Sequence, residues 1–269
     1  MPQPVRNRTR KRIVVQLAII LLLAFCATAC GSAHYVIFEN PEIEKSVRQE
    51  LGISENEKIK AADLEKVVEL AVMLEGESGL SDVTKLSNLE LLMVAGGTVT
   101  DFRDLKEMKA LKDIAIFQSQ VTSFSGLEQI ENLEKLTAQT TSIGDAAGIG
   151  RCKKLKYLSL PATGIEDIEF VRGMDGLEAL TISWNLVKDI GAVSELKALK
   201  EFNAEYCLIE DISPIAANDK LRSLDLSYNM IEDISALSGF SHMDKILLRG
   251  NPIGDRGVLD RIDCPWKEA

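Results

Sequence analysis

Apolar residues recur along most of this chain with a period of 22 residues. Most units carry apolar side chains at all of positions 1, 4, 6, 11, 14, 17 and 20, while positions 3, 5, 7 and 8 vary. The eight regular units begin at Leu89, Leu111, Leu133, Leu155, Leu177, Leu199, Leu221 and Met243. An internal period of this length predicts a solenoid in which each unit forms one turn and packs against its neighbours.

Positions 4 and 6 alternate with variable positions, as in a short strand with one buried face. Stacked turns then pair these strands into a parallel sheet, with about 4.8 Å between neighbouring turns. The apolar side chains of one unit contribute roughly 1.5–3 kcal/mol each, which does not offset an ordering cost of about 1–2 kcal/mol per residue. A single unit is therefore expected to be unfolded, and stability depends on a core that neighbouring turns share.

Positions 9 and 13 carry polar side chains. Position 9 is Asn185, Asn229 and Asn251 in three units, where an amide can satisfy backbone groups of the adjacent turn. Position 13 is aspartate in seven of the eight units, namely Asp101, Asp145, Asp167, Asp189, Asp211, Asp233 and Asp255. Calcium is the alternative explanation, but it needs several oxygen ligands from one loop, and each turn offers one carboxylate or sometimes two. We therefore predict that these aspartates cap short helical turns.

The segment Leu221–Leu237, "LRSLDLSYNMIEDISAL", resembles the leucine-rich repeat L-x-x-L-x-L-x-x-N-x-I in the 22-residue form of bacterial internalin-like proteins. The resemblance covers most of the chain after the first residues. It implies an α/β solenoid, a right-handed superhelix with a parallel concave β-sheet and short helical or 3-10 turns on the convex side. It also implies a protein that works by presenting a binding surface.

The first 29 residues are predicted to be a lipoprotein signal peptide. A basic segment over 6–12 precedes an apolar stretch over 13–25 and the small residues 27–29. "ATACGS", residues 27–32, resembles a bacterial lipobox with alanine in place of the usual leucine, which implies a lipidated Cys30 as the membrane anchor. The alternative is an uncleaved membrane helix over 13–29. Both place the repeats on the outer face of a bacterial membrane, extracellular or periplasmic, because the basic flank stays in the cytoplasm.

The chain is predicted to divide into five segments. They are a signal peptide (1–29), a short tether (30–39), a helical N-terminal cap (40–66), one imperfect and eight regular repeats (67–264) and a C-terminal tail (265–269). Asn40 and Pro41 begin a helix that Gly52 ends, and a second helix is expected at about Ala61–Glu65. The internalin-like cap has threonine where this chain has Lys60, so the second helix is expected to be poorly capped. We expect Trp266 to fold over the open end.

The unit that begins at Leu133 has small side chains at positions where other units have leucine or isoleucine. Ala138, Ala146 and Cys152 leave it less apolar volume. We expect this unit to loosen or bend the solenoid.

The chain is acidic, with a formal charge of −10. Loss of residues 1–29, which hold five basic and no acidic side chains, would leave 26 basic against 41 acidic side chains, a charge of −15. Such a surface disfavours nucleic acid. We find no phosphate-binding loop, nucleophile elbow or zinc spacing, and the only histidines are His34 and His242. We therefore predict a protein that is not an enzyme and needs no metal or cofactor.

The concave face of a leucine-rich repeat consists of positions 3, 5, 7 and 8. The partner-binding candidates at these positions are Met93, Phe117, Tyr157, Trp184, Glu201, Glu205, Tyr206, Asp225 and Tyr228. Trp184, Tyr206 and Tyr228 share position 8 in successive turns, which predicts a ladder of rings. Consensus packing is the alternative for Trp184 and Tyr228, because S-W-N and S-Y-N are common spellings of the repeat. Tyr206 departs from that spelling and is the stronger functional candidate.

These observations predict a monomeric cell-surface lipoprotein that binds a protein partner through its concave face. One alternative is an envelope scaffold or assembly factor that binds components of its own cell. A second is a glycan-binding module, because aromatic rings near carboxylates also suit sugars.

Overall fold

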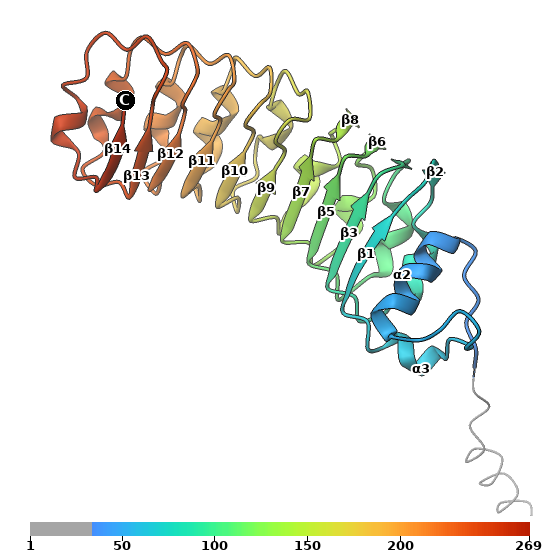
Figure 1. Cartoon of the computed structure of the whole chain (residues 1–269). Helices are drawn as coiled ribbons and strands as arrows, with labels where there is room; N and C mark the ends of the chain where they lie inside the picture. The colour runs from blue at the N-terminus through green and yellow to red at the C-terminus, as the bar shows by residue number, and fades with distance from the viewer. Residues whose placement is uncertain (1–33) are drawn as a thin grey trace, which may run out of the picture.

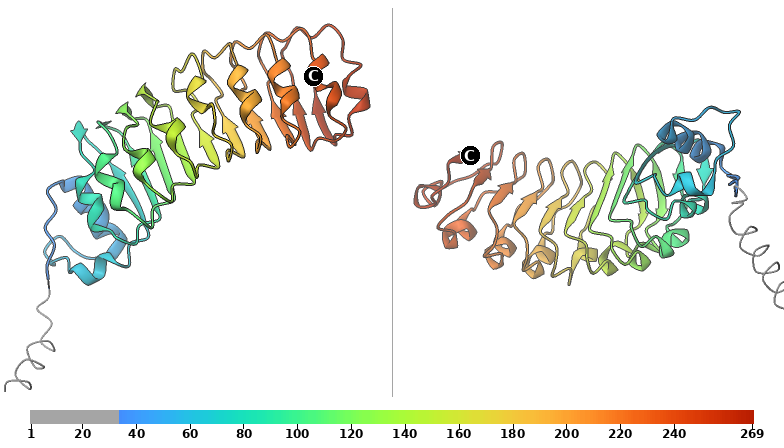
Figure 2. Two further views of the ribbon diagram at one scale, coloured as in Figure 1. Left: turned by 180° about the vertical axis from the view of Figure 1, so that it is seen from behind. Right: turned by 90° about the horizontal axis from the view of Figure 1, so that it is seen from below.

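The computed structural model describes residues 34–269 as a curved solenoid (Figure 1). Its main sheet has ten parallel strands in the order β1-β3-β5-β7-β9-β10-β11-β12-β13-β14. These strands are β1 Glu69–Met73, β3 Leu91–Ala95, β5 Asp113–Phe117, β7 Lys135–Gln139, β9 Tyr157–Ser159, β10 Ala179–Thr181, β11 Glu201–Asn203, β12 Ser223–Asp225, β13 Lys245–Leu247 and β14 Trp266–Glu268. The sheet lines the concave side and helical turns line the convex side (Figure 2). The predicted α/β solenoid is confirmed.

Nine 3-10 helices follow the strands of the described residues, one for each turn. They are η1 Ser81–Lys85, η2 Arg103–Glu107, η3 Leu127–Gln129, η4 Ile149–Arg151, η5 Glu169–Val171, η6 Gly191–Glu195, η7 Ser213–Ala217, η8 Ser235–Gly239 and η9 Leu259–Arg261. A second parallel sheet, absent from our sequence prediction, runs along the first half only. Its strands are β2 Glu77–Ser78, β4 Thr98–Val99, β6 Gln120–Ser123 and β8 Ser142–Asp145.

Strand register confirms the 22-residue spacing except in the last turn. Leu91 pairs with Asp113 and Asp113 with Lys135, each one unit apart. Lys245, however, pairs with Trp266, because the last unit is one residue shorter. Cys264 therefore occupies position 1 of a further partial turn rather than closing the eighth unit.

The predicted tail at 265–269 is wrong, because these residues contain β14 and extend the main sheet. Trp266 does not cover the open end: 57% of it is exposed, and Nζ of Lys245 lies 5.1 Å from the centroid of its ring. The free backbone groups of β13 explain why the chain continues as strand β14, because this strand supplies their hydrogen-bond partners.

Two helices precede the first turn. The side chain of Asn40 accepts hydrogen bonds from the amides of Glu42 and Ile43, and Gly52 ends helix α2, Pro41–Leu51, in a left-handed conformation. Helix α3, Ala61–Leu64, has no side-chain cap at Lys60, as predicted. Helix α2 packs against β1, and its Ile43 joins the core of the solenoid. The signal peptide and Cys30 lie outside the described residues.

The asparagines at position 9 connect neighbouring turns. Oδ1 of Asn185 accepts the amides of Thr163 at 3.0 Å and Gly164 at 2.8 Å. Its Nδ2 donates to the carbonyl oxygens of Leu160 and Ile182, both at 2.8 Å. Asn229 and Asn251 repeat this arrangement with their preceding turns. The predicted role of position 9 is confirmed.

Cys207 interrupts the asparagine series at position 9. Its Sγ lies 3.2 Å from the carbonyl oxygen of Ile182, and a thiol is only a weak donor. We predict that Cys207→Asn raises the free energy of unfolding by about 1 kcal/mol, because the amide adds stronger hydrogen bonds at a buried site. Urea unfolding measures the change.

Cys152→Asn is the matched control, since Cys152 lies in the apolar core and burial raises the pKa of its thiol to about 12. This variant is expected to lose stability. Equal effects of the two substitutions would contradict the assignment of position 9.

The aspartates at position 13 cap the convex turns. In each of the seven, Oδ1 accepts the backbone amide two residues further on, at 2.7–3.1 Å. Asp211 and Asp233 also accept the hydroxyls of Ser213 and Ser235. These bonds hold the pKa of Asp233 below its usual value. Five of the bonded amides begin a 3-10 helix, which confirms the capping prediction for these five aspartates. Asp145 and Asp255 instead accept amides that lie two residues before η4 and η9.

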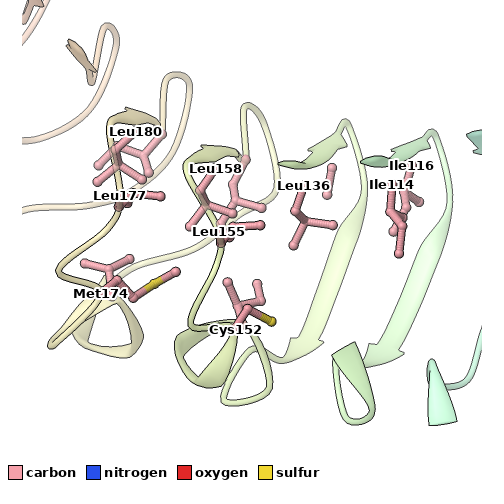
Figure 3. Close-up of a cluster of buried hydrophobic side chains, with 14 of the residues drawn as sticks. Ile114, Ile116, Leu136, Cys152, Leu155, Leu158, Met174, Leu177 and Leu180 are labelled. Carbon is pink, nitrogen blue, oxygen red and sulfur yellow. The ribbon is translucent and has the colours of Figure 1, made fainter. Parts of the chain in front are cut away.

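The unit that begins at Leu133 lets the backbones of neighbouring turns approach closely. A Cβ atom placed on Gly144 would lie 2.1 Å from the carbonyl oxygen of Thr122, and one on Gly148 would lie 2.0 Å from that of Phe124. Ala138 and Cys152 are both buried, and Figure 3 shows Cys152 below the labelled leucines of its own turn. The small side chains of this unit therefore accompany close backbone contact. The expected loosening stays a prediction.

Candidate functional site: the concave surface

The concave surface divides into two groups of side chains. Met93 and Phe117 lie on β3 and β5 in the N-terminal half, while Glu205, Tyr206 and the remaining aromatic ladder lie beyond β10. Tyr157 stands between them on β9 with 45% of its surface exposed. In register, Tyr157 is followed by Ala179 and then by Glu201 on β11.

A groove runs between helix α2 and the N-terminal strands. It has a volume of about 410 Å³, and its apolar floor includes Met73, Met93, Ala95 and Phe117. Met73 is 64% exposed, and with Met93 and Phe117 it makes the floor a contiguous apolar patch. The opposite wall consists of polar side chains of α2, namely Glu42, Lys45, Ser46 and Gln49.

The sequence interpretation placed Met93 and Phe117 on this surface but missed Met73 and the helical wall. The contribution of α2 could be found in the sequence only as a polar helix face. Nothing in that pattern says that the helix lies beside the strands. In the structure, the two predicted residues Met93 and Phe117 form part of one side of this groove.

The aromatic ladder forms as predicted. The ring centroids of Trp184 and Tyr206 are 3.9 Å apart, and those of Tyr206 and Tyr228 are 4.3 Å apart, with interplanar angles of 22° and 9°. Tyr228 in turn lies over Gly250, where a Cβ atom would come within 2.5 Å of its ring. Each ring therefore packs against the next turn, and the ring faces between neighbouring members of the ladder are covered.

The backbone of all three aromatic residues has a left-handed conformation. The φ angles are +62° at Trp184, +53° at Tyr206 and +57° at Tyr228. Bulky side chains adopt this conformation at a cost of about 1–2 kcal/mol. Stacking contributes about 0.5–1.5 kcal/mol for each pair and offsets part of that cost.

Acidic side chains lie beside the ladder. Asp225 is 8% exposed, and its Oδ2 lies 3.5 Å from Nζ of Lys245. Burial and the nearby charge of Asp225 raise the pKa of Glu205, while Lys245 acts in the opposite direction. Burial is also the main cause of the raised pKa of Tyr206. Glu205 and Asp225 make this patch negatively charged, and Lys245 and Arg249 compensate part of that charge.

Within residues 34–269, we find no cluster of three or more histidine, cysteine or acidic side chains placed to hold a metal ion. The same part of the chain contains no helix that is long and apolar enough to cross a membrane. The concave surface presents to a ligand an apolar groove, charged side chains and the edges of aromatic rings.

Comparison with known proteins agrees with this geometry. Residues 217–238 match the family model described as Leucine Rich repeat. Internalin C2 from Listeria monocytogenes superposes with a TM-score of 0.64 at 20% identity, over 86% of this chain and 95% of that chain. The fold is a leucine-rich repeat solenoid.

Two further structures share this leucine-rich repeat fold. The functional domain of InlJ from Listeria monocytogenes has a TM-score of 0.56 at 17% identity, over 84% of this chain and 54% of that chain. A leucine-rich repeat protein from Leptospira interrogans has a TM-score of 0.54 at 20% identity, over 68% of this chain and 56% of that chain. A search of curated protein sequences gives no match.

Proposed function

We propose that this protein is a lipid-anchored, non-enzymatic surface protein of a bacterial envelope that binds a protein partner through its concave face. The groove beside α2 carries the binding proposal. It exposes the apolar side chains Met73, Met93 and Phe117 in one concave place, with polar groups at its edge. An apolar cleft with a polar rim is the usual site for an anchoring side chain of a protein partner.

The ladder favours a protein over a glycan. A sugar ring stacks on the face of an exposed aromatic ring, but both faces of Tyr206 are covered by its neighbours. Within the ladder this leaves Trp184, which is 56% exposed and stacks on Tyr206 with one face, as the ring available to a sugar. The ladder offers ring edges to a ligand, together with the carboxylates of Glu201 and Glu205. Such a surface suits a basic side chain of a protein partner at this end of the sheet.

Site-specific crosslinking tests the binding proposal. A photoreactive residue in place of Met73 should crosslink a discrete protein on intact cells or in the medium they meet. Met93→Glu should reduce this product at least tenfold, because a charge enters the apolar floor of the groove. Lys197→Glu, on the convex side, is the matched control and should leave the product unchanged.

The outcomes separate the alternatives. A product that Met93→Glu does not reduce would exclude the groove, and the absence of any product would exclude a protein partner there. A product from the cell's own envelope would favour the scaffold alternative. The anchor is tested separately by the mass of the membrane-extracted protein: a lipidated Cys30 terminus supports it, and an intact Met1 terminus contradicts it.

A further inference from the structure

The edge of the solenoid that follows the concave strands differs between the two halves. In the first half the second sheet lies on this edge, and position 10 carries the polar residues Thr98, Gln120 and Ser142. Figure 1 shows β2, β6 and β8 along this rim, which continues as loops in the second half. There position 10 becomes apolar, with Leu186, Leu208 and Met230 in successive turns.

Two of these apolar side chains are exposed to solvent, and Leu208 between them is half-buried. Leu186 is 51% exposed and Met230 is 52% exposed, whereas the residues on either side of them in sequence include the buried Asn185 and Asn229. The apolar series begins after the second sheet ends at β8, with Gly164 at position 10 of the unit between them. We refer to Leu186, Leu208 and Met230 as the apolar rim.

Two grooves repeat along the apolar rim at the spacing of one unit. One groove of about 340 Å³ is lined by Leu208 and Pro214 with Glu210 and Asp211. The next, of about 520 Å³, is lined by Met230 and Pro252 with carboxylates that include Glu232 and Asp233. Each groove therefore combines an apolar floor with acidic walls, and the second continues the first.

Some carboxylates of the acidic walls form no ion pair within the described residues. Asp211 and Asp233 accept hydrogen bonds from the convex turns. In contrast, the structure shows no ion-pair partner for the exposed Glu210 and Glu232 within residues 34–269. Lys188 lines the first groove, and the lining of the second groove contains no basic side chain.

This charge determines the occupant. A second copy would bring the same carboxylates into contact with themselves, and an anionic membrane surface would be repelled. A segment with apolar and basic side chains matches both the floor and the walls. Neighbouring turns lie about 4.8 Å apart at the paired strands, close to the pitch of about 5.4 Å at which an α-helix presents one side chain per turn. An extended strand repeats the same face at about 6.8 Å and loses register sooner.

We propose that the apolar rim, with Glu210 and Glu232, binds a basic amphipathic helix of a partner protein. Leucine or methionine side chains of that helix enter the two grooves, and its lysines or arginines pair with the free glutamates. This surface does not depend on the concave groove and uses different residues.

A defined peptide pair tests the proposal. The probe is a dye-labelled helical peptide with leucines on one face and lysines on the other, and its control has glutamate in place of every lysine. Titrated with the full chain and followed by fluorescence anisotropy, the lysine peptide should bind and the glutamate peptide should not. The double variant Leu186→Ser/Met230→Ser should weaken binding at least tenfold, without loss of fold because both side chains are exposed.

Two further variants locate the site. Glu210→Gln/Glu232→Gln should weaken binding and reduce its dependence on salt. Thr98→Ser/Gln120→Ser, at position 10 of the first half, should leave binding unchanged, as should Met93→Glu in the concave groove. Binding that survives Leu186→Ser/Met230→Ser, equal binding of the two peptides, or no binding of the lysine peptide would overturn the proposal.

Discussion

Replacing Asn185 by alanine is expected to lower the free energy of unfolding by about 3–5 kcal/mol. The side chain is 4% exposed and satisfies backbone groups of two turns at once. Alanine leaves at least two backbone groups, the buried amide of Thr163 and the partly buried amide of Gly164, without their acceptor. Each such group costs about 1–3 kcal/mol.

Urea unfolding followed by circular dichroism measures the effect. Asn88→Ala is the matched control, because Asn88 is exposed and donates one hydrogen bond, to the carbonyl oxygen of Glu65. The control should lose less than about 1 kcal/mol. Similar losses in the two variants would show that position 9 does not hold neighbouring turns together.

Gly148→Ala is expected to destabilise the protein by about 3 kcal/mol. The new Cβ atom would meet the carbonyl carbon of Phe124 at 2.5 Å and its oxygen at 2.0 Å. Backbone atoms of an adjacent turn cannot rotate away as a side chain can. The two turns must therefore separate, and their shared apolar contacts weaken.

Gly239→Ala is the control for this prediction. No atom lies within 4 Å of a Cβ atom placed at Gly239, and alanine reduces the freedom of the unfolded chain. Its unfolding midpoint in urea should stay constant or rise slightly. A loss at Gly148 no larger than at Gly239 would mean that the close approach of the turns carries no energetic weight.

The sequence was most informative where one side chain has one local task. The strands, the asparagines of position 9 and the aspartates of position 13 repeat every 22 residues, so each prediction could be checked against several units. Tyr206 is a further example, since its ring lies in the ladder despite a departure from the consensus spelling.

Predictions failed where the outcome depends on how segments pack. To predict the groove beside α2, one must know where the helix lies relative to the sheet. The spacing of Ile43 and Val47 does not determine this position. The second sheet needs neighbouring loops in register, and its residues, such as Thr98, do not show a strand pattern long enough to recognise. The shortened last turn appears in the sequence only as a single missing residue before Cys264.

The repeated contacts between turns allow the solenoid to gain or lose whole 22-residue units. Because the upper and lower faces of each turn are built from the same positions, one unit can be lost or copied and still join its neighbours. Removal of residues 199–220 would bring Asn229 against the turn that contains Val187, with equivalent groups on both sides. The sheet would shorten by about 4.8 Å. In this region duplication and deletion change the length of the solenoid in fixed steps of one turn.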